Sequence, residues 1–104
     1  MAESALKGNM KVKTLKADFK KAFGASLRVY KSATCKGAFA DDDATLASIR
    51  AEGKAGGELK IVGNMQVGNF EKKIADMYGI GVQVADKNDS ALADNSGTIA
   101  AAGR

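Results

Sequence analysis

Histidine, proline and tryptophan are absent from this sequence of 104 residues, and Cys35 is its only cysteine. Without histidine, the chain lacks the commonest general base and metal ligand of enzyme sites. A single cysteine excludes a disulfide within the chain and is typical of a reducing compartment. Because only Lys31 and Lys36 lie near Cys35 as activating cations, we interpret it as an incidental loop thiol. We therefore expect a cytoplasmic protein that is not an enzyme, with no cofactor and no evident small-molecule substrate.

Long hydrophobic runs are absent as well. No stretch approaches the roughly 20 apolar residues that cross a bilayer, and residues 1–7 are too short and too polar for a signal peptide. Acidic residues gather at 41–43 and again between Asp86 and Asn95, but their spacing does not match a calcium-binding loop. Aspartate and asparagine are favoured at turns and helix caps for local reasons. We expect neither a membrane segment nor a metal site.

Positive charge dominates only the first half of the chain. The whole sequence carries 16 lysines and arginines against 12 aspartates and glutamates, a formal net charge of +4. Residues 1–54 hold eleven basic against six acidic residues, whereas residues 55–104 hold five against six. This asymmetry indicates an acidic or polyanionic partner for one face, unless the lysines serve only to keep the surface solvated.

What the sequence does contain is an internal repeat. Residues 8–12 (GNMKV) match residues 63–67 (GNMQV) at an offset of 55, and this offset continues without a gap. After a small change in length, residues 39–47 match residues 92–100 at an offset of 53. Apolar residues are kept where a core needs them, while the other positions drift. We expect one domain, residues 1–104, made of two repeats at about 8–52 and 63–104 with a linker at 53–57.

Each repeat predicts one long helix and one short one. Apolar residues spaced by three and four form a helical face over residues 15–23 in the first repeat and 70–78 in the second. We expect each long helix to have an N-cap before it and a left-handed glycine after it. The predicted caps are Thr14 and Gly24 in the first repeat and Asn69 and Gly79 in the second. A short helix or turn is predicted within residues 41–49, where the acids favour its N-terminal end.

Alternation of apolar and polar residues predicts the strands. It runs over residues 27–30 and 82–85, and residues 59–62 form a third candidate. The pair Gly63-Asn64 suits a two-residue hairpin after residues 59–62, and Gly8-Asn9 is its weaker equivalent. The order of elements predicts an α+β fold, an internally duplicated strand–helix–strand–short-helix unit with two helices on one small mixed sheet.

Part of this pattern resembles the ubiquitin-like β-grasp superfamily. Residues 12–24 and 27–30 look like the strand end, helix and following strand of such a domain, while residues 39–49 and 59–62 look like its acidic turn and its central strand. The resemblance implies a β-grasp-like binding module. The C-terminal Ala-Gly-Arg lacks the diglycine tail of conjugated ubiquitin-like proteins, so a modifier role is not implied. A ferredoxin-like fold, also describable as two duplicated βαβ units, is the alternative.

The candidate binding surface is the basic face of the first helix and the strand after it. Three lysines spaced by three and four share one helical face, and two more flank them. An arginine and a tyrosine follow on the outer face of the strand, where the tyrosine could stack on a base. The predicted partner- or nucleic-acid-binding residues are Lys11, Lys13, Lys16, Lys20, Lys21, Arg28 and Tyr30. No catalytic or metal-binding residue is predicted.

These features predict a small binding module that pairs with an acidic protein or with a second copy of itself, as a possible homodimer. Nucleic-acid binding is the alternative hypothesis, because a basic patch beside an aromatic residue is the electrostatic signature of such proteins. In the second repeat the equivalent helix carries a mixed face, with Glu71, Lys72, Lys73 and Asp76. Any basic partner surface therefore belongs to the first repeat.

The nucleic-acid hypothesis makes a direct prediction. The protein should retain a fluorescent oligonucleotide at low salt, and retention should fall steeply as the salt concentration rises, because phosphate contacts release counterions. The double substitution Lys16→Glu and Lys20→Glu should abolish retention. Fluorescence anisotropy measures both effects, and an absence of retention at low salt contradicts the hypothesis.

Overall fold

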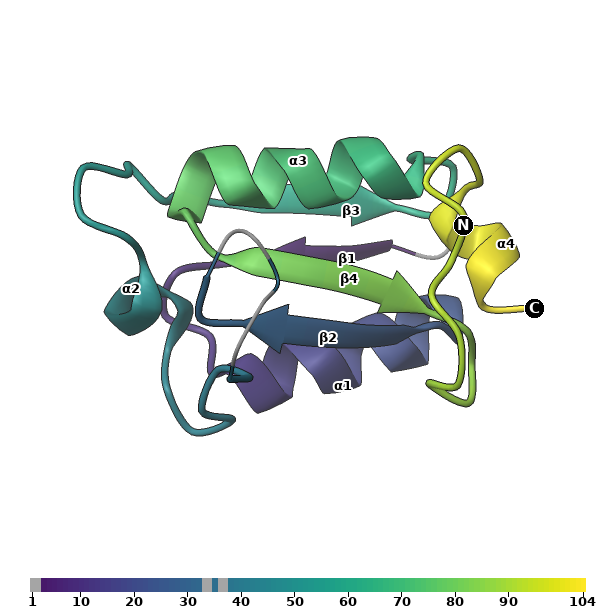
Figure 1. Cartoon of the computed structure of the whole chain (residues 1–104), viewed down its shortest axis with the longest axis horizontal. Helices are drawn as coiled ribbons and strands as arrows, with labels where there is room; N and C mark the ends of the chain where they lie inside the picture. The colour runs from purple at the N-terminus through teal and green to yellow at the C-terminus, as the bar shows by residue number, and fades with distance from the viewer. Residues whose placement is uncertain (1–2, 33–34, 36–37) are drawn as a thin grey trace.

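The computed structural model describes residues 3–32, 35 and 38–104. Within these residues the fold is α+β, as predicted, with four helices and four strands (Figure 1). The first half contributes β1 (Glu3–Leu6), α1 (Val12–Phe23), β2 (Ser26–Tyr30) and α2 (Leu46–Ile49). The second half contributes β3 (Leu59–Val62), α3 (Val67–Tyr78), β4 (Gly81–Ala85) and α4 (Ile99–Ala102). No helix of the described part is long and apolar enough to span a membrane.

The strands form two antiparallel pairs instead of one sheet. β1 pairs with β3, and β2 pairs with β4. The single mixed sheet that we predicted, and that a β-grasp or ferredoxin-like arrangement needs, is therefore wrong for the strands that the structure describes. The reason is that each long helix connects two strands of different sheets. Alternation in the sequence tells that a strand is half-buried, but it does not tell which strand will pair with it.

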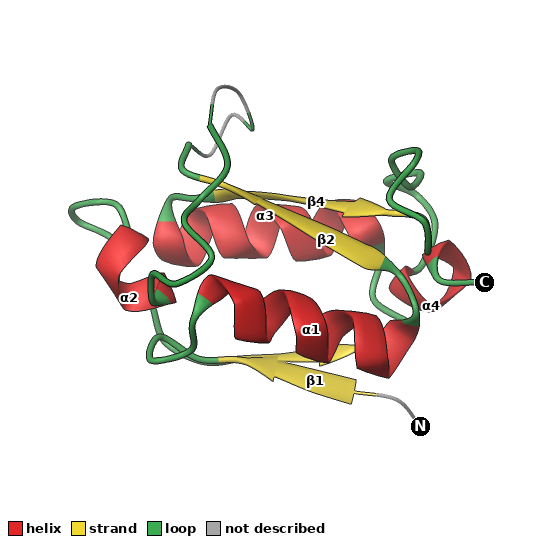
Figure 2. Ribbon diagram, turned by 90° about the horizontal axis from the view of Figure 1, so that it is seen from below, coloured by secondary structure: helices red, strands yellow, loops and turns green. Residues whose placement is uncertain are grey.

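The two long helices lie between the two strand pairs, as Figure 2 shows. The rings of Phe19 in α1 and Phe70 in α3 stack with their centroids 5.5 Å apart, and both side chains are fully buried. Phe23 meets Phe19 edge-on at 5.0 Å. The strands close this core with their inward side chains, which are Leu6, Leu59 and Ile61 from one pair and Leu27, Val29, Val82 and Val84 from the other.

Corresponding elements recur at the offsets found in the sequence. α3 begins and ends 55 residues after α1, β4 lies 55 residues after β2, and α4 lies 53 residues after α2. In the β1–β3 pair, Ala5 lies opposite Lys60, its own counterpart at the offset of 55. In the β2–β4 pair, Arg28 lies opposite its counterpart Gln83. Counterparts that face each other are what an approximate two-fold axis through both pairs produces.

Both long helices begin earlier than predicted. Thr14 and Asn69, the predicted N-caps, lie inside α1 and α3, whereas the N-cap positions are Lys11 and Gln66 without a side-chain capping bond. The first N–H of each helix instead donates to a backbone carbonyl of the loop before the following short helix. These hydrogen bonds run from Val12 N–H to Ala44 O and from Val67 N–H to Gly97 O, both at 2.8 Å. A tertiary contact has replaced the local cap.

Glycine plays one predicted role and lacks another. The predicted hairpins are wrong, because Gly8-Asn9 and Gly63-Asn64 turn the chain from a strand into a helix. The predicted C-caps are confirmed, since Gly24 and Gly79 adopt left-handed conformations with φ of 79° and 69°. At Gly79 a side chain is excluded twice, because its Cβ would also collide with Ala51.

The two short helices are capped by their own threonines. Thr45 Oγ1 accepts from the Ser48 N–H and Thr98 Oγ1 accepts from the Ala101 N–H, each at 3.1 Å. The short helix that we predicted within residues 41–49 is confirmed as α2.

The stacked phenylalanines predict a large difference between buried and exposed rings. Phe70→Ala should lower the free energy of unfolding by about 3–5 kcal/mol, because it empties a fully buried site between the helices. Phe39→Ala is the matched control, since Phe39 is exposed, and it should cost less than about 1 kcal/mol. Urea denaturation followed by circular dichroism measures both values. Equal losses for the two variants would contradict this core.

Candidate functional site

The basic face of α1 is paired with the acidic turn before α2. Lys13 Nζ lies 2.9 Å from Asp43 Oδ1, and Lys16 Nζ lies 3.1 Å from Asp42 Oδ1. The hydrogen bond between Lys13 and Asp43 is the main cause that raises the pKa of Lys13 and lowers the pKa of Asp43. These exposed pairs add little to stability. Their effect is to offset positive charge on the surface that we predicted for a polyanionic partner.

The loop after β4 engages two further residues of the predicted surface. Lys20 Nζ donates to the backbone carbonyl of Lys87, and Arg28 Nε donates to Asp89 Oδ1 at 2.7 Å. The same contact with Asp89 is the main cause that raises the pKa of Arg28. Lys11 and Lys21 are exposed, with no ion pair among the residues that the structure describes.

Tyr30 does not offer its ring to a base. Its side chain is only 8% exposed, and its hydroxyl donates to Gln83 Oε1 at 2.9 Å. The ring of Phe39 lies 4.8 Å from the Tyr30 ring, where an isolated bridge joins the two residues. Our prediction of an exposed stacking platform at Tyr30 is therefore wrong. The alternation placed Tyr30 on the outer face correctly, but it could not show that a later segment folds back over the ring.

Phe39 and Leu92 are the large apolar side chains that the described structure leaves exposed, at 60% and 52%. They are counterparts at the offset of 53, and we call them the apolar pair. Each forms an isolated antiparallel bridge to the last residue of a strand, Phe39 to Tyr30 and Leu92 to Ala85. The next residue then donates its N–H into the strand, from Ala40 to Val29 O at 2.9 Å and from Ala93 to Val84 O at 2.8 Å.

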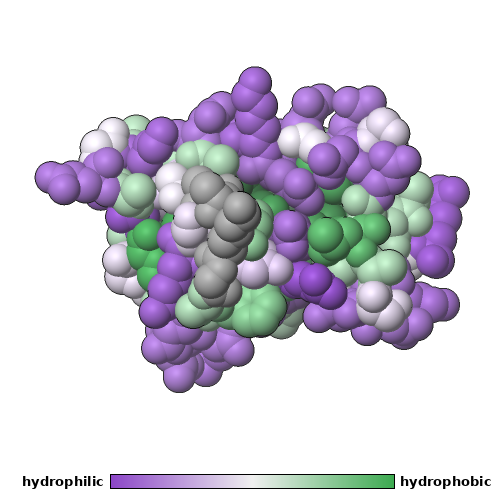
Figure 3. Space-filling view, viewed as in Figure 1, coloured by the Kyte–Doolittle hydropathy of each residue, from purple (hydrophilic) through white to green (hydrophobic). Residues whose placement is uncertain are grey.

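The apolar pair belongs to the outer side of the β2–β4 strands. Figure 3 views the molecule from this side and shows separate apolar areas within a mostly hydrophilic surface. Leu92 lines a hollow of about 220 Å³ beside α4 and another of about 350 Å³ with Glu71 and Gln83. The repeat suggested that apolar matches mark the core, and for these two residues that interpretation is wrong. A usable signal was that both lie outside any predicted helix or strand.

Glu71 and Cys35 are the titratable groups with shifted pKa values near this surface. Glu71 Oε2 accepts from the Val84 N–H at 3.1 Å, and burial raises the pKa of this half-buried carboxyl more than the hydrogen bond lowers it. Burial, followed by the charge of Glu71, raises the pKa of the Cys35 thiol. A raised pKa makes the thiolate scarcer and the thiol less reactive. Over the described ranges, no group of three or more potential ligand side chains is placed to hold a metal ion.

The raised pKa of Glu71 predicts a pH dependence of stability. The folded chain holds this proton at pH values where the unfolded chain has lost it, so its contribution to stability falls as the pH rises above about 4.3. Glu71→Gln keeps an acceptor for the Val84 N–H and removes the titration. The free energy of unfolding of the native chain, minus that of the variant, should therefore fall between pH 4 and pH 7. We expect a fall below about 1 kcal/mol, because solvent still reaches the carboxylate.

Urea denaturation at several pH values measures this difference. Aspartates with lowered pKa values, such as Asp86 and Asp94, titrate in both proteins and cancel. A difference that rises with pH would contradict the assignment.

Comparisons with protein-family models, with curated proteins and with solved structures find no match to this chain. No relative therefore supplies a function, a partner or a site residue. The geometry of the apolar pair and the pairing of the charged side chains are what a proposal about function can use.

Proposed function

We propose that this chain is a small non-catalytic binding module that docks a protein partner, or a second copy of itself, on the outer side of the β2–β4 strands. The observation that carries the proposal is the exposure of the apolar pair, Phe39 and Leu92, at 60% and 52%. Single exposed apolar residues are common on soluble proteins. These two differ because backbone hydrogen bonds hold both at matching places beside the same strand pair.

The surroundings of the apolar pair support a protein interface. Interfaces commonly have an apolar or aromatic centre and a polar rim. Here the Tyr30 ring supports Phe39 from beneath, and the Arg28–Asp89 ion pair supplies polar groups on the same pair of strands. Aromatic anchors held in place before binding lose little side-chain entropy, which favours affinity. A cytoplasmic location accords with the lone cysteine.

Nucleic-acid binding has less support than the sequence alone suggested. The ion pairs of Lys13 and Lys16 with Asp43 and Asp42 reduce the charge that α1 offers to phosphate groups. The ring of Tyr30 is covered, so the stacking contact has no platform there. An acidic partner protein faces the same competition from Asp42 and Asp43. The lysine face of α1 is therefore the weaker of the two candidate surfaces.

We also propose that the chain arose by internal duplication. The identical spacing of helices, strands, glycine C-caps and threonine N-caps in the two halves supports this origin. Kinship with the ubiquitin-like β-grasp superfamily is a hypothesis that rests on the sequence, and the two separate strand pairs give it no support. The proposed function does not depend on that kinship.

The proposal predicts that the apolar pair controls association. Phe39→Ser combined with Leu92→Ser should abolish self-association or partner capture, while changing the free energy of unfolding by less than about 2 kcal/mol, because both side chains are exposed. Sedimentation velocity over a range of concentrations measures self-association, and capture from a lysate of the source cell measures partner binding. Lys60→Ser, on the opposite strand pair, is the control and should change neither. The proposal fails if the double variant associates like the native chain, or if the native chain is a monomer that captures no protein.

A further inference from the structure

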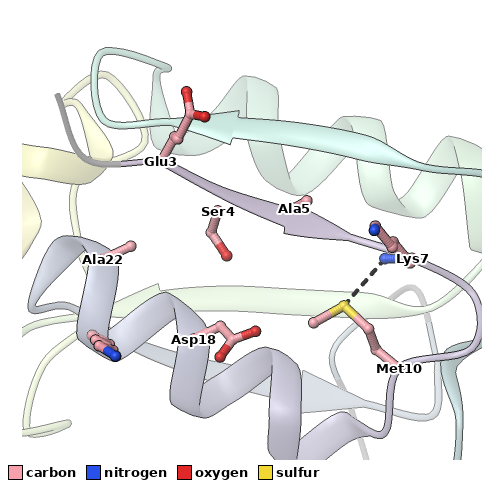
Figure 4. Close-up of a pocket in the computed structure, with 8 residues that line it drawn as sticks. Glu3, Ser4, Ala5, Lys7, Met10, Asp18 and Ala22 are labelled. Carbon is pink, nitrogen blue, oxygen red and sulfur yellow. Dashed lines mark hydrogen bonds between the residues drawn. The ribbon is translucent and has the colours of Figure 1, made fainter.

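A groove of about 740 Å³ lies between β1 and α1. It is on the β1–β3 side of the helices, whereas the apolar pair is on the β2–β4 side (Figure 2). In Figure 4, Ser4 of β1 points toward α1, and Asp18 and Ala22 of α1 face the strand across the groove. The groove is therefore a second surface, and an inference about it stands without the proposed function.

The second half of the chain fills the corresponding place with its own side chains. At the offset of 55, Ser4 corresponds to Leu59 and Ala22 corresponds to Met77. Leu59 is only 7% exposed and belongs to the core, and Met77 packs against the core. Two large apolar side chains in one half are thus replaced by a hydroxymethyl and a methyl group in the other. The groove is the space that these two substitutions leave open.

The strand that borders the groove is paired on one side only. β1 makes its ladder with β3, and no other described strand pairs with it. In an antiparallel pair, alternate residues direct their N–H and C=O groups away from the partner, and such an edge accepts an added strand. Four residues of strand span about 13 Å. A short extended peptide is long enough to use this edge.

We propose that the groove between β1 and α1 binds an extended peptide segment of a partner protein, added as a strand beside β1, with a leucine- or methionine-sized side chain seated between Ser4 and Ala22. Backbone hydrogen bonds to β1 supply affinity, and the seated side chain supplies specificity, as in other cases of strand addition. Lys7 and Lys21 line the groove without an ion pair among the described residues, so an acidic residue beside the apolar one fits best.

The test uses a peptide copied from this chain. A fluorescein-labelled peptide with the sequence of residues 58–62 (ELKIV) carries a glutamate next to a leucine, and these residues already pair antiparallel with β1 on its other side. Fluorescence anisotropy measures its binding to the full chain. Replacing its leucine by serine should weaken binding at least fivefold, because the seated side chain is lost. Amide chemical-shift changes should map to β1 and to the part of α1 that holds Asp18 and Ala22.

Two protein variants separate the groove from other surfaces. Ser4→Leu combined with Ala22→Met imports the residues of the second half, and it should weaken peptide binding at least tenfold by filling the groove. Ala5→Leu makes a similar change of size on the same strand at an exposed residue that points away from α1, and it should alter binding less than twofold.

Several outcomes would overturn the proposal. They are an absence of binding up to about 1 mM peptide, equal binding of the leucine and serine peptides, and shift changes confined to β2 and β4. If the filled variant fails to fold, the peptide pair and the shift map still decide. A native chain that self-associates while the filled variant is a monomer in sedimentation velocity would assign the groove to a second copy instead.

Discussion

Every strand pair in the described structure joins a strand of one half to a strand of the other half. β1 and β2 have no partner within their own half, and neither do β3 and β4. The backbone groups of a lone strand are left unpaired, so neither half has a stable sheet without the other. The stacking of Phe19 on Phe70 between the pairs completes this dependence, because each ring buries the other. The domain is therefore a unit of two halves that fold together.

This cross-pairing decides what the two halves must share and where they are free to differ. The inward positions and the helix ends are shared, since both halves supply one helix and two strands to a single core. Outward positions carry no such constraint, and Lys16 in α1 corresponds to Glu71 in α3. Lys16 reaches out to Asp42, whereas Glu71 turns back to the Val84 N–H of β4. The same scaffold position serves the surface in one half and the strand edge in the other.

The sequence was informative wherever the cause was local. The apolar spacing of α1 and α3, the left-handed Gly24 and Gly79, and the alternation in β2 and β4 all depend on neighbours within a few residues. It failed where a distant segment decides the outcome. Ala44 O, far along the chain, satisfies the first N–H of α1 that Thr14 was expected to cap, and Phe39 folds over the ring of Tyr30. The candidate surfaces are distant effects of this kind, so residue patterns alone missed them.

The two candidate surfaces differ in symmetry, and that difference constrains their partners. Phe39 and Leu92 are counterparts, so the β2–β4 side presents two similar apolar contacts related by the approximate two-fold axis through Arg28 and Gln83. Such a surface suits a partner that is itself two-fold, and a second copy of the chain meets that condition. The groove exists in one half only, because Leu59 and Met77 fill its counterpart. A peptide in the groove therefore binds once per chain, which leaves the symmetric side free for a second interaction.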